Sequence, residues 1–112
     1  MIIYHITRKE NLRGVLDSGN YTGDTLQTEG FIHCSTANQV IEVANRRFKG
    51  ESGLVLIVIE TDLVKPEIRY ENLEGGINLF PHIYGPLNRD AIRKTIDLIP
   101  GQDGLFTFPD GE

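Results

Sequence analysis

Hydrophobic residues follow two contrasting patterns along this chain, and each pattern predicts a β-strand. The segment 2–6 is rich in β-branched residues, and alternation along a strand places Ile3, His5 and Thr7 on one face. The run 54–59 is apolar at every position, which is typical of a central strand buried on both faces. These two segments therefore predict strands within one sheet.

The stretch 30–36 combines strand-forming residues with an imidazole, a thiol and two hydroxyl groups. Alternation places Phe31, His33 and Ser35 on one face of this predicted strand, with Cys34 on the opposite face. A strand end is a rigid support on which α/β and α+β proteins tend to place chemistry. We therefore take this stretch as the first place to look for a functional site.

Two helix-start patterns follow strand-like segments early in the chain. Capping boxes at residues 7–10 and 36–39 predict helices over about 8–17 and about 37–48, each with an apolar stripe. The polar stretch 20–29 shows no periodicity and predicts a loop with a short strand near its start. Such a loop is either a binding lid or a simple connection.

The second half of the chain predicts mainly strands. Short strand patterns occur at 68–71, 79–84 and 95–98, and residues 88–92 suit one helical turn. Pro81 lies within the second of these strands, and because proline cannot donate to a ladder, it restricts that strand to an edge or a bulge.

The order of these elements predicts an α+β fold, with two early helices beside a curved or split sheet. At 112 residues the chain is expected to form one domain, 1–112, with a core that needs no metal or disulfide. The tail from about residue 100 is rich in Gly, Pro and Asp, and we expect it to be only partly ordered.

Charge and cysteine usage narrow the classes of function. The formal net charge of −5 argues against a broad nucleic-acid surface. The basic residues Arg46, Arg47 and Lys49 form either a local basic patch or a solvated helix end, and the helix dipole favours the second interpretation. A single cysteine excludes an internal disulfide framework. No apolar run reaches membrane-spanning length and no signal-peptide pattern is present, so a cytoplasmic protein is predicted; the oligomeric state is left open.

The three histidines are the main candidates for chemistry. His5, His33 and His82 each lie in a strand-like segment beside hydroxyl or aromatic residues. The simpler alternative for each is a half-buried imidazole satisfied by the backbone. No short metal-ligand pair is present, and Cys34 faces away from His33, so we predict no metal site and a buried, unreactive cysteine.

Three segments together resemble a known family. These are 4–7 (Tyr-His-Ile-Thr), 30–35 (Gly-Phe-Ile-His-Cys-Ser) and 80–87 (Phe-Pro-His-Ile-Tyr-Gly-Pro-Leu). Their residues, order and spacing resemble the uncharacterised bacterial family DUF952. Its members look like relatives of the ADP-ribosyltransferase fold, a split β-structure that grips NAD in a cleft, and are similar to its RNA 2′-phosphotransferase branch.

The resemblance implies a function as well as a fold. It implies an NAD- or nucleotide-processing transferase, of ADP-ribosyl- or 2′-phosphotransferase type, with NAD as the cofactor and a small-molecule or nucleotide ligand as the partner. The alternative is a non-catalytic module that binds a nucleotide or other small ligand. The late glutamate of many transferases of this fold has no recognisable equivalent here. The implied catalytic residues are His5 and His33, and the implied binding residues are Thr7, Phe31, Ser35, His82 and Tyr84.

Overall fold

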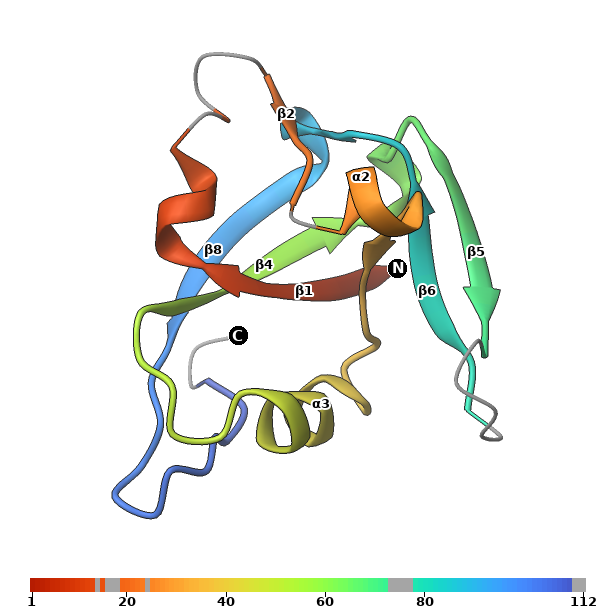
Figure 1. The fold of residues 1–112 in the computed structure, drawn as a ribbon. Coiled ribbons are helices and arrows are strands. Elements are labelled where there is room, and N and C mark those ends of the chain that lie inside the picture. The colour runs from red at the N-terminus through yellow and green to blue at the C-terminus, as the bar shows by residue number, and fades with distance from the viewer. Residues whose placement is uncertain (14, 16–18, 24, 73–77, 110–112) are drawn as a thin grey trace.

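The apolar run in the middle of the chain forms strand β4 (Leu54–Glu60), which is the central strand of an antiparallel sheet (Figure 1). Its neighbours are β1 (Ile2–Arg8) and β8 (Ile92–Leu98). Every β4 residue except the last is buried, which confirms the prediction of a central strand covered on both faces. The computed structural model describes residues 1–13, 15, 19–23, 25–72 and 78–109.

The two faces of this sheet belong to separate hydrophobic clusters. Ile3 and Ile57 pack in one cluster, whereas Tyr4 packs in the other with Val40 of helix α3 (Val40–Arg47). The alternation predicted for β1 is therefore confirmed, and α3 covers the Tyr4 side of the sheet (Figure 1).

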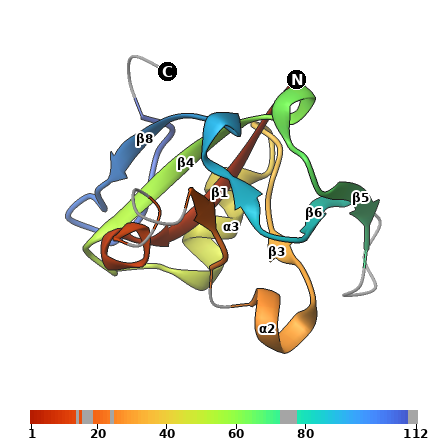
Figure 2. The same cartoon turned by 90° about the horizontal axis from the view of Figure 1, so that it is seen from above.

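A second antiparallel sheet stands beside the first, as the view from above shows (Figure 2). Its strand order is β3 (Ile32–His33), β6 (Phe80–Tyr84) and β5 (Glu67–Glu71). Ile32 and Cys34 are buried in the core, as alternation along 30–36 predicts.

The predicted edge position of Pro81 is wrong, because β6 is the central strand of this sheet. Pro81 lies opposite Tyr70 on β5, while its carbonyl oxygen accepts a hydrogen bond from the Cys34 N–H on the other side, with an N···O distance of 3.0 Å. Its missing N–H therefore faces Cys34, where the short β3 ladder ends. Only the reciprocal bond of that one pair is lost, so the proline is tolerated in a central strand.

The two sheets meet at an isolated bridge between Tyr4 and Ser35. The N–H of each residue donates to the carbonyl oxygen of the other, with both N···O distances 2.8 Å. Within the described residues, no other pair joins β1 to the 33–35 segment as a ladder. The mixed α+β class is confirmed, and the sheets separate beyond this single bridge.

Helix α3 is confirmed, but it is shorter than the predicted 37–48. The N–H of Thr36 donates to Oε1 of Gln39 at 3.0 Å, and the carbonyl oxygen of Thr36 accepts from the Gln39 and Val40 N–H groups. The capping pattern therefore builds a turn, and the α-helix begins only at Val40.

The helix predicted over 8–17 is confirmed only in part. Strand β1 continues to Arg8, which pairs with Leu54, a short 3₁₀ helix η1 (Lys9–Leu12) follows, and Val15 is helical. Oγ1 of Thr7 accepts from the Asn11 side chain, so sheet pairing and this bond replace the capping box. Residues 14 and 16–18 of that prediction lie outside the described residues.

The polar stretch expected to be a loop contains two short elements. Strand β2 (Asn20–Tyr21) confirms the strand near its start and pairs with β7 (Leu87–Asn88). Helix α2 (Leu26–Glu29) was not predicted, and it ends at Gly30, whose φ of 86° suits glycine.

The remaining elements close the ends of the sheets. The 3₁₀ helix η2 (Thr61–Leu63) lies between β4 and β5 in sequence, and η3 (Arg89–Ala91), between β7 and β8, is the helical turn predicted over 88–92. In the tail, Phe106 is buried and packs with Ala44. Among the residues described, no helix combines the length and apolar character needed to cross a membrane.

Candidate functional site

A cavity of about 170 Å³ lies beside the bridge between the sheets. Strand β1, the 33–35 segment and the last turns of α3 form its walls. The polar residues that line it are His5, Thr25, His33, Ser35, Arg46 and Arg47, and its apolar lining includes Tyr4, Val43, Phe48 and Phe80.

His5 lies in the cavity wall with both ring nitrogens bonded to the protein. Its Nδ1 contacts the backbone carbonyl oxygen of His33, and its Nε2 lies 2.7 Å from the hydroxyl oxygen of Tyr21. Because a carbonyl oxygen only accepts, Nδ1 carries the proton and Nε2 accepts from Tyr21. The ring is 8% exposed, so these two bonds fix both its tautomer and its orientation.

His33 also lines the cavity and carries an acidic partner. Its Nε2 is 3.1 Å from Oε1 of Glu29, the last residue of α2. The His33 side chain is 37% exposed, so this imidazole remains open to solvent and to the cavity. Helix α2 thus places a carboxylate at the imidazole for which the family resemblance implies a catalytic role.

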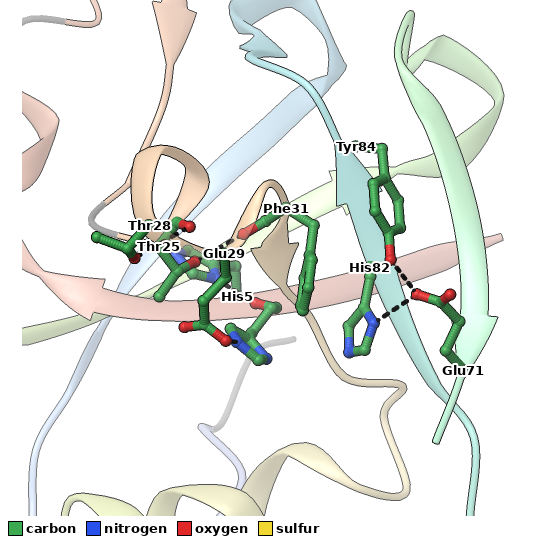
Figure 3. Close-up of polar contacts among 9 residues, drawn as sticks. His5, Thr25, Thr28, Glu29, Phe31, Glu71, His82 and Tyr84 are labelled. Carbon is green, nitrogen blue, oxygen red and sulfur yellow. Dashed lines mark hydrogen bonds and ion pairs between the residues drawn. The ribbon is translucent and has the colours of Figure 1, made fainter. Parts of the chain in front are cut away.

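A second carboxylate organises the far side of the site. Oε1 of Glu71 accepts hydrogen bonds from the Tyr84 hydroxyl at 2.5 Å and from Nδ1 of His82 at 3.0 Å (Figure 3). These donors, Tyr84 first, hold the pKa of Glu71 below its usual value, and Glu71 raises the pKa of Tyr84. His82 and Tyr84 therefore share one face of β6, as alternation predicts.

Phe31 joins these groups into an aromatic cluster of Phe31, His33, His82 and Tyr84. Its ring stacks on His82 with centroids 4.3 Å apart, and lies 4.8 Å from His33 and 5.2 Å from Tyr84. The guanidinium of Arg69 covers the Tyr84 ring at 4.5 Å. His82 is 4% exposed, so it does not simply meet solvent as an edge residue would.

The predicted site residues thus fall into two adjoining groups. His5, His33 and Ser35 line the cavity, while Phe31, His82 and Tyr84 form the aromatic cluster with His33. The seventh, Thr7, is buried, accepts from Nδ2 of Asn11 at 2.9 Å and does not line the cavity. The functional role of each residue stays a prediction.

The segment 6–95 matches a family described as a protein of unknown function, DUF952. The chain belongs to the DUF952 family. Its fold is similar to the crystal structure of protein CC0527 from Caulobacter crescentus, with 29% identity, coverage of 96% of this chain and 94% of that one, and a TM-score of 0.84. The solution structure of CC0527 gives 30% identity, coverage of 93% and 90%, and a TM-score of 0.80. No functionally curated protein matches the chain.

Sequence reasoning missed the acidic residues that this DUF952 domain places beside its histidines. Glu29 is four residues from His33 in a stretch expected to be a loop, and Glu71 is eleven residues from His82 on the paired strand. The only signal for Glu71 is its place at the end of a short strand pattern. Nothing in that pattern shows which strand lies next to it.

Arg46 and Arg47 are also part of the cavity lining rather than only a solvated helix end. Arg46 forms an ion pair with Glu42, one turn earlier, with an N···O distance of 3.7 Å. The position of both arginines in the cavity lining depends on how α3 is rotated about its axis against β1. The capping pattern alone does not determine that rotation.

Cys34 is buried, as predicted, and burial raises the pKa of its thiol. A raised pKa leaves little thiolate near neutral pH, so the cysteine is not suited to act as a nucleophile. Within the described ranges, no group of three or more His, Cys, Asp and Glu side chains is placed to hold a metal ion.

Proposed function

We propose that this protein is an NAD- or nucleotide-processing transferase with an ADP-ribosyltransferase-like arrangement, and that the cavity between the sheets is its ligand site. The observation that carries the proposal is the free edge of β1 at Ile6, which lines the cavity. The family resemblance of the motifs around His5 and His33 supports the same site.

The orientation of the Ile6 backbone follows from the bridge. Tyr4 uses both its N–H and its carbonyl for Ser35, so these groups point away from β4. In an antiparallel strand, alternate residues point their backbone groups the same way, and Ile6 is two residues further along. Since no strand in the described structure pairs with Ile6 on that side, its N–H and carbonyl point to the cavity.

An adjacent donor and acceptor are complementary to a primary carboxamide, such as that of nicotinamide. The aromatic lining, Tyr4, Phe48 and Phe80, suits a flat ring, and Ser35 and His33 supply polar side chains for ribose hydroxyls. A cavity of about 170 Å³ is close to the size of one that holds a single aromatic ring. The cavity therefore takes the ring and its amide, and the rest of a dinucleotide extends outside.

The transferase reaction breaks the bond between the ring nitrogen and the ribose carbon, and nicotinamide leaves with the bonding electrons. Positive charge then develops on the ribose, and a nearby carboxylate stabilises it. Glu29, bonded to His33 at 3.1 Å, is the acidic residue beside the cavity. In this proposal His33 orients the ligand, and His5 is a positioning residue that holds the His33 backbone.

A specific observation favours the second candidate, a module that binds the ligand without turning it over. Both His5 nitrogens are already bonded to the protein, and the Glu71 carboxylate is bonded to His82 and Tyr84 rather than lining the cavity. The cavity lining itself contains no carboxylate among the described residues.

Thermal-shift measurements with NAD, ADP-ribose, nicotinamide and 2′-phosphorylated RNA test the proposal. A ligand at one hundred times its Kd stabilises the folded state by about 2.7 kcal/mol, which raises the melting temperature by several degrees. We expect Ser35→Ala to weaken the NAD response, and Ser52→Ala, an exposed serine outside the cavity, to leave it unchanged. Absence of a shift with all four ligands contradicts the proposed function.

Release of nicotinamide during incubation with NAD separates the two candidates. A transferase releases nicotinamide as the ribose carbon forms its new bond to water or to an acceptor, and Glu29→Gln slows the release. A binding module gives the thermal shift without release. Binding of NAD without release of nicotinamide would support the ligand site and contradict the transferase reaction.

A further inference from the structure

We propose that Arg46 and Arg47 form an anion subsite at the cavity, which holds a phosphate group of the ligand. This inference rests on the proposed function, which identifies the ligand as a nucleotide. It adds that most of the binding affinity comes from the enclosed ring and the single phosphate next to it. The ligand class is therefore a mononucleotide unit, and the second half of a dinucleotide contributes little.

The position of the two arginines carries this proposal. Both lie in the last turn of α3, and both line the cavity together with His33 and Ser35. A guanidinium presents several N–H donors in a planar fork, which matches phosphate oxygens and binds them through two parallel hydrogen bonds. Two successive arginines at one cavity thus form a wall suited to an oxyanion.

The charges around the cavity support an anionic ligand. The chain carries a net charge of −5, yet its cavity is lined by two arginines. The acidic neighbour of Arg46 is Glu42, whose side chain is 76% exposed and whose nearest oxygen is 3.7 Å away. An exposed pair at that distance contributes little, so a phosphate can replace it at low cost.

The helix dipole offers a simpler explanation, because cations are favoured at any helix C-terminus. Lys49 follows the same helix end, is exposed, and does not line the cavity. The dipole acts on Lys49 as it acts on the arginines, so it does not account for the cavity position of Arg46 and Arg47. This difference also makes Lys49 a matched control.

The size of the cavity determines which part of the ligand lies inside it and which part extends outside. About 170 Å³ holds one ring, whose amide meets the Ile6 backbone, and the sugar then carries its 5′ substituent out of the enclosed part. Arg46, with a side chain that is 48% exposed, marks the open side of the lining. The first phosphate is the group that reaches this side.

The experiment compares nicotinamide riboside with nicotinamide mononucleotide, which differ by one phosphate, in calorimetric titrations at low salt. We expect the mononucleotide to bind at least about tenfold more tightly, and Arg46→Gln or Arg47→Gln to remove most of that difference without changing riboside affinity. Lys49→Gln is expected to change mononucleotide affinity by less than about twofold. Added salt should weaken binding of the mononucleotide and should not weaken binding of the riboside.

Inorganic pyrophosphate, titrated into the same four proteins, separates failure of this inference from failure of the proposed function. Equal affinities for riboside and mononucleotide overturn the anion subsite and leave the ring site intact. Pyrophosphate binding that depends on the arginines, with no binding of either nicotinamide compound, supports the anion subsite and overturns the proposed function. An equal effect of Lys49→Gln and the arginine variants, or no binding at all, overturns the subsite.

Discussion

Replacing Tyr21 by phenylalanine tests how firmly His5 is held at the cavity wall. The Tyr21 side chain is 1% exposed, and its hydroxyl oxygen lies 2.7 Å from Nε2 of His5. Phenylalanine keeps the aromatic ring and its packing, so the substitution removes only the buried hydroxyl group. It leaves an imidazole nitrogen that has lost its donor.

The expected destabilisation follows from the burial of both partners. A neutral hydrogen bond contributes about 0.5–1.5 kcal/mol net, but a buried acceptor left unpaired costs about 1–3 kcal/mol. With His5 8% exposed, water replaces the hydroxyl poorly, and we expect the higher range, about 2 kcal/mol. In a chain of this length that loss lowers the melting temperature by roughly 6–12 °C.

Urea denaturation followed by circular dichroism measures the free energy of unfolding. Tyr70→Phe is the control, because Tyr70 is 42% exposed, and its change should stay within about 0.5 kcal/mol. A double-mutant cycle with His5→Leu should give a coupling energy of about 1 kcal/mol or more. A Tyr21→Phe loss below about 0.5 kcal/mol, or an additive cycle, would refute the view that this bond anchors His5.

Three further predictions concern the tail, the thiol and the second carboxylate. Phe106→Ala should cost about 3–5 kcal/mol in urea denaturation, and Leu105→Ala, at a 40% exposed side chain, far less; equal effects would contradict packing of the tail. Cys34 should react slowly with thiol reagents in the native protein and tolerate replacement by valine; rapid labelling at neutral pH would restore a reactive thiol. Because the folded-state pKa of Glu71 is lowered, its stabilising contribution is present above about pH 4.3 and is lost as the pH falls through the lowered value. Glu71→Gln should remove this part of the acid dependence of unfolding, and an unchanged pH profile would disprove the role of the Tyr84 and His82 bonds.

The strands whose hydrophobic pattern is local and complete could be predicted from the sequence. The apolar run of β4 and the alternation in β1 each indicate which faces of the strand must be buried. The same logic placed Cys34 in the core and Phe31 beside His33, since a strand separates neighbouring side chains between its faces.

Features that depend on distant partners could not be predicted in this way. Thr7 belongs to a capping pattern, but the pairing of Arg8 with Leu54 extends the strand through it. Pro81 predicts an edge strand, but its missing N–H faces Cys34, just beyond the last pair of the β3–β6 ladder. In both cases a contact far along the chain outweighs a local preference.

The candidate site shows the same division between residues and their partners. The sequence selected the imidazoles, because His5, His33 and His82 are the only ones and each lies in a strand pattern. It did not reveal that Tyr21 or Glu71 would bond to them, because each partner lies on another element. These partners decide which nitrogen carries the proton, and therefore what each imidazole can do.

The break between the two sheets explains why the cavity forms where it does. The bridge at Tyr4 and Ser35 uses one residue of the β1 edge, and the next residue with the same orientation, Ile6, is left facing the cavity. An unpaired strand edge inside a protein is costly unless water, a ligand or another chain satisfies it. With Arg46 and Arg47 on the facing helix, that edge combines an amide-like donor and acceptor with positive charge, and a nucleotide offers complements to both.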